Sequence, residues 1–386
     1  MEKGSVKIAI VKEGFRSLAR EVKDLSHGGR VLLFTEEGRS GEDAQAALTF
    51  EGMQVTRRNV PEKLSDDFFA ELQKAPEGIM AAVAVGGVRP IEAAKAAHIP
   101  SVIPKVLFPT ELSALSAADE RIYLSTKGDL PSTRSTGHAV LLDPALLAAS
   151  PLRPGLGYLL ALLTEEADEA YERLILTGES PASALRALKE KTSFLTDIRE
   201  ENAAEDLSKS ALALLKVSAP KKNIGSAHTL ALLAARKTGG AFSDYLFPAA
   251  YALLRLYEGY LSSLPLEHCP PPDRTENLKL LNAKCGVLPS LFHRKQKTYA
   301  ENYDERRRLT AEYREDFSEA INERSIPLCA LSRLYRRTPH EKESSPLLSA
   351  GDLLMLLSLT GEAVSGYPLI KHIKMTGLLE PLLRCG

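Results

Sequence analysis

The sequence of 386 residues contains no tryptophan and only four cysteines, and these absences exclude several classes of protein. Aromatic residues make up 6% of the chain, so the composition gives no indication of a stacking surface for nucleobases or sugars. Cys269, Cys285, Cys329 and Cys385 are too few and too scattered for a disulfide framework. We therefore expect reduced thiols and a cytoplasmic protein.

A surplus of charge of one sign is also absent, because 49 Lys and Arg face 50 Asp and Glu. Nucleic-acid-binding domains are typically basic, so we expect no nucleic-acid partner. With 44% hydrophobic residues, the chain does not have the composition of a disordered protein. Its longest strongly apolar stretch, 156–163, is too short to span a bilayer, and residues 1–7 lack the apolar segment of a signal peptide. We expect no membrane partner, and a small-molecule substrate or a nucleotide as the ligand.

The first 150 residues alternate between strand-like and helix-like segments. Short β-branched or apolar runs predict strands at 7–11, 30–34, 53–60 and 79–85, and helical spacing predicts helices at 14–25, 42–51 and 66–74. The run 79–85 is wholly apolar, which suits the buried centre of a parallel sheet. This alternation predicts a doubly wound α/β sheet.

From Pro151 onward the pattern is helical, and almost no strand signal remains. We expect helices at 156–176, 181–189, 203–215, 226–237, 246–261, 275–284, 299–322 and 350–359. The predicted fold class is therefore an α/β N-terminal doubly wound domain, residues 1–150, followed by an all-α C-terminal domain, residues 151–386.

The sharpest local motif is a glycine pair, Gly86-Gly87, that ends the apolar strand and precedes a helix. Glycine lets backbone N–H groups approach a phosphate, and the N-terminus of the helix adds partial positive charge. A doubly wound sheet binds nucleotides at such a turn. The alternative is an ordinary tight turn between a strand and a helix, because short glycine motifs are weak signals.

Four stretches occur in an order and at spacings typical of one protein family. They are 86–95 (Gly-Gly-Val-Arg-Pro-Ile-Glu-Ala-Ala-Lys), 99–104 with 109–113 (Ile-Pro-Ser-Val-Ile-Pro and Pro-Thr-Glu-Leu-Ser), 140–147 (Val-Leu-Leu-Asp-Pro-Ala-Leu-Leu) and 225–230 (Gly-Ser-Ala-His-Thr-Leu). Over about residues 5–260 the chain thus resembles the superfamily of dehydroquinate synthases and iron-dependent alcohol, glycerol and glycerol-1-phosphate dehydrogenases. The resemblance implies a dehydroquinate synthase-like fold.

In that family the glycine-rich turn holds the pyrophosphate of NAD or NADP, and the resemblance carries this role to Gly86 and Gly87. Where the family has Gly-Gly-Gly-Ser, this chain continues with Val88 and Arg89. Pro90 removes one possible backbone donor, and Arg89 could compensate as a charged donor to phosphate.

Three further residues are candidates for binding the same cofactor. Glu36, at the end of the second predicted strand, could accept a hydrogen bond from an adenosine ribose hydroxyl, which would favour NAD over NADP. The alternative for Glu36 is a solvated carboxylate in a turn. Thr110 and Ser113 could contact the cofactor from the loop after the fifth strand.

The metal-binding residues of the family are not matched in this sequence. Its first two ligands would fall in 155–163, which has neither a carboxylate nor a histidine, and its last in 238–242, Thr-Gly-Gly-Ala-Phe. Only His228 stands where a ligand is needed, and one ligand cannot hold a catalytic Zn²⁺ or Fe²⁺. We therefore expect no metal, and a buried, hydrogen-bonded His228 is the alternative to a ligand.

Without a metal, another group would have to polarise a substrate oxygen. Lys95 and His228 are the catalytic candidates, with His138 and Tyr158 as further donors. By resemblance, the reaction would be an NAD(P)-linked oxidoreduction of a small polyol or its phosphate. The alternatives are a non-catalytic scaffold or regulatory protein, and a cyclase like dehydroquinate synthase. A homo-oligomer is compatible with each of these.

Overall fold

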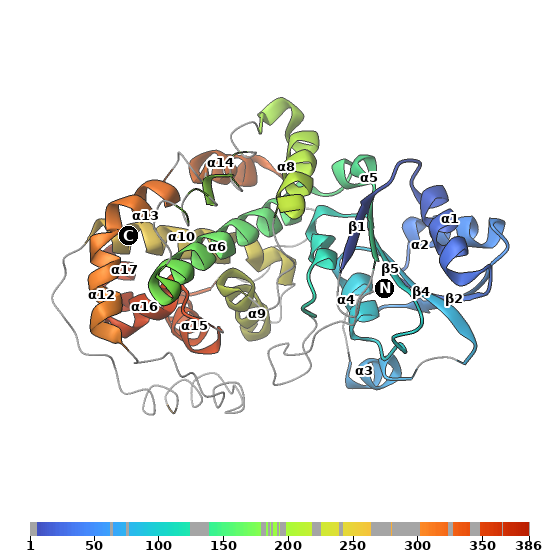
Figure 1. Ribbon diagram of the computed structural model, residues 1–386, viewed down its shortest axis with the longest axis horizontal. Helices are drawn as coiled ribbons and strands as arrows, with labels where there is room; N and C mark the ends of the chain where they lie inside the picture. Colours follow the sequence, from blue (N-terminus) through green and yellow to red (C-terminus); the bar gives the residue numbers. More distant parts are fainter. Residues whose placement is uncertain are drawn as a thin grey trace. The chain divides into compact units, whose positions relative to one another are not determined.

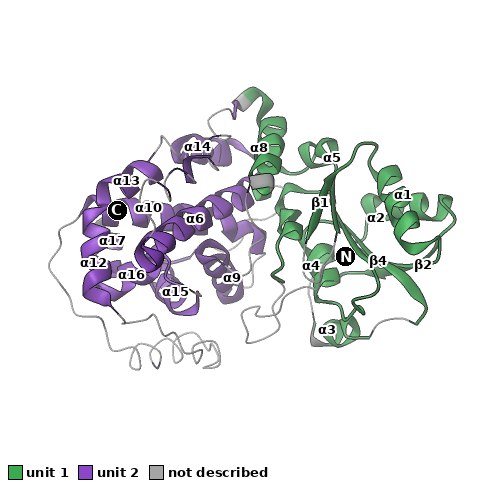
Figure 2. Ribbon diagram, viewed as in Figure 1, with its two compact units in different colours: residues 1–127, 131–155, 201–222 green, residues 128–130, 156–200, 223–386 purple. Residues whose placement is uncertain are grey.

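The computed structural model divides into two compact units (Figure 2). The first comprises residues 1–127, 131–155 and 201–222, and the second comprises 128–130, 156–200 and 223–386. The structure describes residues 6–61, 65–74, 77–123, 139–178, 183, 186, 188–190, 193, 198–217, 225–238, 242–263, 279, 302–322, 327–339, 348–364 and 366–385. No described helix combines the length and the apolar character that crossing a membrane requires.

The first unit is built on a six-stranded sheet in which all the pairings are parallel (Figure 1). The strands are β1 (Lys7–Ile10), β2 (Arg30–Thr35), β3 (Gln54–Asn59), β4 (Ile79–Gly86), β5 (Lys105–Pro109) and β6 (Ala139–Leu142). Their order is β1-β6-β5-β4-β2-β3, which places β4 inside the sheet between β5 and β2. The apolar strand predicted at 79–85 therefore lies in the interior of the sheet, as expected of a parallel strand covered on both faces.

Helices of the first unit pack on the sheet and on one another. They are α1 (Phe15–Ser26), α2 (Arg39–Phe50), α3 (Asp66–Leu72), α4 (Val88–Ala96), α5 (Pro144–Ala148) and α8 (Ala203–Val217), with the 3₁₀ helix η1 (Leu112–Ala118). Leu18 and Leu48, from α1 and α2, pack in one core with Leu33, Val83 and Phe108 from three neighbouring strands. Alternate strand residues point to the same face, so one residue in two from each strand enters this core.

Side chains at helix starts fix where the helices of this unit begin. The Ser65 hydroxyl accepts a hydrogen bond from the Phe68 N–H at 3.2 Å, which is an N-cap directly before the helix predicted at 66–74. The Asp143 carboxylate caps α5 and also accepts a hydrogen bond of 2.8 Å from the Gly14 N–H. Asp143 therefore ties the start of α5 to the start of α1.

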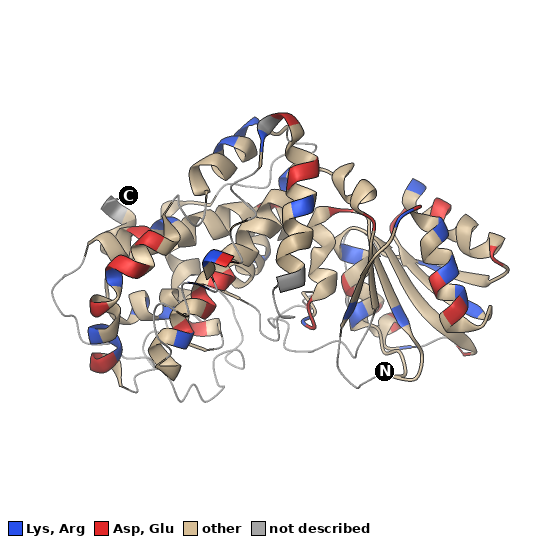
Figure 3. Ribbon diagram, turned by 45° about the horizontal axis from the view of Figure 1, so that its top comes forward, with Lys and Arg blue, Asp and Glu red and all other residues tan. Residues whose placement is uncertain are grey.

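The second unit is helical, and its described residues contain no strand. Its helices are α6 (Leu152–Thr177, whose first four residues belong to the first unit), α9 (Ser226–Thr238), α10 (Phe242–Ser262), α12 (Tyr303–Glu312), α13 (Arg314–Ile321), α14 (Leu328–Arg337), α15 (Ala350–Ala363), α16 (Leu369–Met375) and α17 (Leu379–Cys385). A short 3₁₀ helix, η3 (Glu200–Asn202), precedes α8. Basic and acidic side chains occur on helices of both units, as the even charge balance leads one to expect (Figure 3).

Two expectations about these helices need comment. The single helix expected at 299–322 is wrong, because the chain breaks at Tyr313 into α12 and α13. The helices expected at 181–189 and 275–284 lie largely outside the described residues. The remaining predicted helices of this unit are present with boundaries shifted by a few residues, which is the usual uncertainty of helix ends.

Candidate functional site

The first unit contains a topological switch point between β2 and β4. These strands are neighbours in the sheet, but the chain continues from β2 to β3 on one side and from β4 to β5 on the other. In open α/β sheets, ligands bind outside the carboxyl ends of the two strands at which the connections diverge. Glu36 directly follows β2, and Gly86 ends β4, so residues predicted from the sequence lie at this point.

The glycine-rich turn has the backbone that its sequence suggests. Gly86 has φ of 133°, a conformation that residues with a Cβ rarely adopt. A Cβ at Gly86 would also lie 2.9 Å from Cγ of Pro90. Thr110 donates its backbone N–H to the Gly86 carbonyl at 3.0 Å, so the start of the loop after β5 is joined to this turn.

A carboxylate lies against the second glycine of the turn. Gly87 precedes α4, and a Cβ at Gly87 would lie 2.9 Å from Oε2 of Glu111 and 3.2 Å from its Oε1. The hydroxyl of Ser113 donates to the same Oε2 at 3.0 Å. Ser113, a predicted cofactor contact, therefore holds Glu111 beside the glycine turn, and the sequence analysis had not assigned a role to Glu111.

Glu36 and Arg89, both predicted to bind the cofactor, are bound to each other. Nε of Arg89 donates to Oε1 of Glu36 at 3.1 Å, and the two side chains are 31% and 29% exposed. Arg57 of β3 donates to the Glu36 backbone carbonyl at 3.1 Å. Glu36 is thus an ion-paired residue that is still partly open to solvent, and not merely a solvated carboxylate in a turn.

Lys95 lies elsewhere, in the interior of the first unit. Its ammonium donates to Oε1 of Glu92 at 2.9 Å and to the Ser116 carbonyl at 3.0 Å, and both members of the ion pair are fully buried. Burial, with a smaller effect from the Lys95 charge, lowers the pKa of Lys105 to about 8. The geometry gives Lys95 the role of an internal tie between α4 and η1.

His228 lies in the second unit, in a buried cluster of polar and aromatic side chains. Its Nδ1 lies 2.5 Å from Oε1 of Glu165, and its side chain is fully buried. The Tyr158 ring meets the imidazole edge-on at a centroid distance of 5.8 Å, and the Phe242 ring lies at 6.0 Å. A carboxylate at Nδ1 favours the tautomer that carries its proton there. His138, the remaining histidine candidate, lies outside the described residues.

The described residues around His228 do not supply the three ligands that a catalytic metal centre needs. Tyr158, Leu162 and Glu165 share one face of α6 by their spacing of four and three residues. The stretch 155–163, to which the resemblance assigns the first ligands, lies in the first turns of α6 and offers neither a carboxylate nor a histidine. Residues 239–241, from the last ligand stretch, lie outside the described part. Among the described residues, no three His, Cys, Asp or Glu side chains cluster as a metal would need.

Asp168, one turn beyond Glu165, organises a second buried network that the sequence analysis missed. Its carboxylate accepts hydrogen bonds from the Ser226 hydroxyl, from the Tyr257 hydroxyl at 2.8 Å and from the Leu369 N–H at 3.2 Å. Burial outweighs these bonds and raises the pKa of Asp168 to about 7. The signal in the sequence is a group of four acidic residues within 165–169, Glu165, Glu166, Asp168 and Glu169, inside a helix whose preceding turns are apolar.

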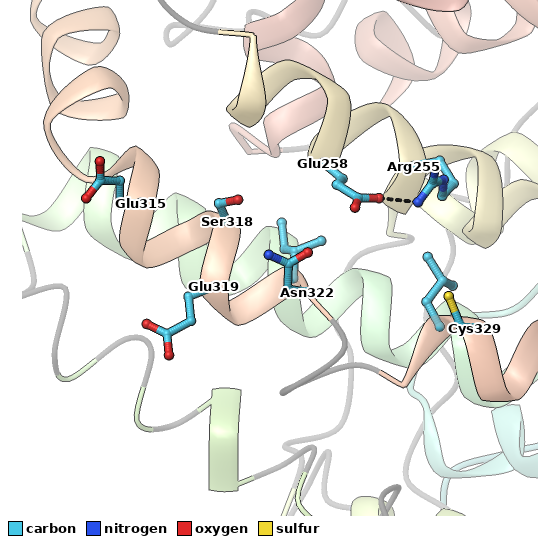
Figure 4. A pocket seen from close by; sticks show the side chains of 9 residues that line it. Arg255, Glu258, Glu315, Ser318, Glu319, Asn322 and Cys329 are labelled. Atoms are coloured by element: carbon cyan, nitrogen blue, oxygen red, sulfur yellow. Dashed lines mark hydrogen bonds and ion pairs between the residues drawn. The ribbon is translucent and has the colours of Figure 1, made fainter.

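A cavity of about 550 Å³ lies in the second unit, where α10, α13 and α14 meet (Figure 4). It is lined by Arg255, Glu258, Glu315, Ser318, Glu319, Ile321, Asn322, Leu328 and Cys329. Arg255 and Glu258 form an ion pair of 2.5 Å across consecutive turns of α10. None of the residues predicted to bind a ligand lines this cavity.

The structure is similar to solved structures of dehydrogenases. Glycerol dehydrogenase from Schizosaccharomyces pombe matches 89% of this chain over 95% of its own length, with 17% identity and a TM-score of 0.50. An iron-containing alcohol dehydrogenase from Thermococcus thioreducens matches 99% of each chain, with 16% identity and a TM-score of 0.56. A probable glycerol dehydrogenase from Sinorhizobium meliloti 1021 matches 100% of this chain and 98% of its own, with 15% identity and a TM-score of 0.54.

These similarities confirm the predicted resemblance at the level of the fold. The chain has the fold of the iron-containing alcohol dehydrogenases and glycerol dehydrogenases, with a parallel sheet of six strands followed by a helical region. No protein-family model matches the sequence, and no curated protein matches it either.

Proposed function

We propose that the protein binds NAD or NADP at the carboxyl ends of β2 and β4 and carries out an NAD(P)-linked oxidoreduction of a small polyol or its phosphate. The proposal is supported by the position of the predicted cofactor-binding residues in the sheet. Glu36, Gly86, Gly87 and Arg89 lie at the switch point of the sheet, and Thr110 bonds to the same turn. This is the place at which open α/β sheets bind nucleotides.

The residues of the first unit divide the binding of the cofactor between them. The Glu36 carboxylate would accept from ribose hydroxyls, which favours NAD because a 2′-phosphate would meet a negative charge. Arg89 would donate to a phosphate as a charged donor. The bound nicotinamide would accept or supply a hydride. We include no step through a metal, because the stretch 155–163 offers neither a carboxylate nor a histidine.

A non-catalytic scaffold or regulatory protein is the second candidate, and one observation favours it. Both predicted catalytic residues have buried carboxylate partners: Lys95 forms an ion pair with Glu92, and Nδ1 of His228 lies 2.5 Å from Oε1 of Glu165. A cyclase like dehydroquinate synthase has less support, because that chemistry requires both a dinucleotide and a metal.

Thermal unfolding in the presence of nucleotides tests the proposal. A ligand present at one hundred times its dissociation constant should stabilise the protein by about 2.7 kcal/mol. We expect NAD to raise the melting temperature more than NADP does, and the variant Glu36→Gln to reduce that preference. The absence of any shift with millimolar NAD, NADP or NADH would refute cofactor binding. Binding without reduction of NAD by any polyol or polyol phosphate would favour the scaffold.

A further inference from the structure

Glu111 occupies the space that the glycine turn leaves open. A second glycine in such turns lets a pyrophosphate approach the backbone closely, since no Cβ intervenes. At Gly87 the position of the missing Cβ lies 2.9 Å from one oxygen of Glu111 and 3.2 Å from the other. Both oxygens of the Glu111 carboxylate therefore occupy the space that a Cβ would need, and a phosphate approaching Gly87 from this side would meet them.

The local electrostatics explain why a carboxylate is stable in this position. Gly87 is the residue before α4 (Val88–Ala96), whose N-terminus carries partial positive charge and attracts anions. The Ser113 hydroxyl donates to Oε2 of Glu111 at 3.0 Å and holds the carboxylate against the turn. The Glu111 carboxylate thus lies beside the helix N-terminus, where a phosphate would be attracted.

Because of the charged groups at the switch point, Glu111 and a bound pyrophosphate would compete for the same position. Arg89 is the cation nearest to the turn along the chain, and its guanidinium is bound to Glu36 at 3.1 Å. A pyrophosphate would therefore meet two carboxylates and one arginine that is already paired. Like charges at contact distance repel by an amount that partial burial increases.

We propose that Glu111 is an internal competitor for the phosphate position and a determinant of ligand specificity at this site. A ligand with a pyrophosphate or diphosphate binds only when the Glu111 carboxylate leaves Gly87. A neutral ligand such as adenosine binds beside Glu36 without that displacement. This inference rests on the proposed function, because it assumes that the ligand of the switch point is an adenine dinucleotide.

Isothermal titration calorimetry with adenosine, ADP, NAD and inorganic pyrophosphate tests this role of Glu111. The variants are Glu111→Gln, which keeps the shape of the side chain, and Glu111→Thr, which removes the charge and shortens the side chain. We expect both variants to bind ADP, NAD and pyrophosphate about tenfold more tightly than the unchanged protein, a difference of about 1.4 kcal/mol. The affinity for adenosine should stay the same.

Glu37→Gln is the matched control, because it removes an exposed carboxylate from the turn after β2 and so changes the net charge equally. An equal gain in this control would assign the effect to net charge and overturn the inference, as would a gain for adenosine. Ser113→Ala provides an independent variant should both Glu111 variants fail to fold. It frees the carboxylate from its hydroxyl donor and should give a smaller gain for the same three anionic ligands.

The failures of the two proposals are distinguishable. Equal ADP and NAD affinities in the unchanged protein and in the Glu111 variants would overturn the competition while leaving cofactor binding intact. No binding of NAD, ADP or pyrophosphate by any of these proteins would overturn both. If the unchanged protein binds these ligands weakly and only the Glu111 variants bind them more tightly, both proposals are supported.

Discussion

Asp168 is a buried carboxyl group whose charged form is disfavoured by its surroundings. Transfer of a carboxylate from water into a protein interior disfavours its charged form unless hydrogen bonds compensate. Three donors, from Ser226, Tyr257 and Leu369, only partly offset the burial of Asp168. The side chain therefore holds its proton up to a pH of about 7.

This raised pKa predicts a stability that falls as the pH rises. Between pH 3.8 and about 7 the folded protein retains a proton at Asp168 that the unfolded chain has lost, so folding is favoured at the acidic end of this range. At 1.36 kcal/mol for each pKa unit, the loss across the range is on the order of 4 kcal/mol. Urea unfolding from pH 4 to pH 8 should show this slope, and Asp168→Asn, which keeps an acceptor for Tyr257, should flatten it.

Asp352 provides a control, because its pKa is shifted in the direction opposite to that of Asp168. Its pKa is lowered, mainly by a hydrogen bond from the Ser349 hydroxyl, so its contribution to stability is present above pH 3.8 and is lost as the pH falls further. Asp352→Asn should therefore leave the slope between pH 4 and pH 8 unchanged. A slope that persists in Asp168→Asn would contradict the assignment.

At the scale of the element, one face of α6 supplies the side chains that contact His228. Tyr158 and Glu165 both meet His228, and Leu162 lies between them on the same face. A carboxylate at Nδ1 is the arrangement that orients a metal-binding histidine in many metalloproteins, with Nε2 as the ligand atom. The face thus has the support for a metal-binding histidine without the other ligands.

We therefore predict that Tyr158→Asp combined with Leu162→His confers metal binding on the protein. The carboxylate and the imidazole added on α6 would join His228 to make three ligands, the number found in catalytic zinc sites. Metal analysis after exposure to Zn²⁺, and the visible absorption of Co²⁺, should show about one ion per chain in this variant. Tyr158→Asn with Leu162→His is the control, and equal binding by the control or by the unchanged protein would disprove the prediction.

The elements of the first unit could largely be predicted from the sequence, because they depend on local patterns. The strands expected at 30–34 and 79–85 are observed at 30–35 and 79–86. The partners of individual side chains could not be predicted from the sequence, because they depend on which segments the fold brings together. Glu36 meets Arg89 across 53 positions only because β2 lies next to β4, and His228 meets Glu165 across 63.

At the scale of the whole molecule, α8 joins the first unit although it follows α6 in the chain. It packs against α5 and η1, and the Ser208 hydroxyl donates to the Pro144 carbonyl at 3.4 Å. Leu207 and Leu214 of this helix are buried, with exposed fractions of 0% and 1%. The core of the first unit therefore depends on a segment that lies beyond residue 200.

Truncation of Leu207 should consequently destabilise the unit that contains the sheet. Replacement of a buried leucine by alanine costs about 2–5 kcal/mol, so Leu207→Ala should reduce the hydrogen-exchange protection of residues 79–86. Leu253→Ala in α10, which is buried to the same degree, should instead reduce the protection of residues 242–263. Equal losses in both regions for both variants would show that the two units unfold as one.

The position of α8 in the chain also bears on synthesis. Domains generally fold from the N-terminus as the chain emerges, at about 5–20 residues per second. The sheet is complete once β6 has been made, but α8, which packs against α5 and η1, ends only at Val217. For the seconds that this interval lasts, the nascent chain carries a finished sheet with an uncovered apolar surface over α5 and η1. That surface is where we expect a chaperone or a neighbouring nascent chain to bind first.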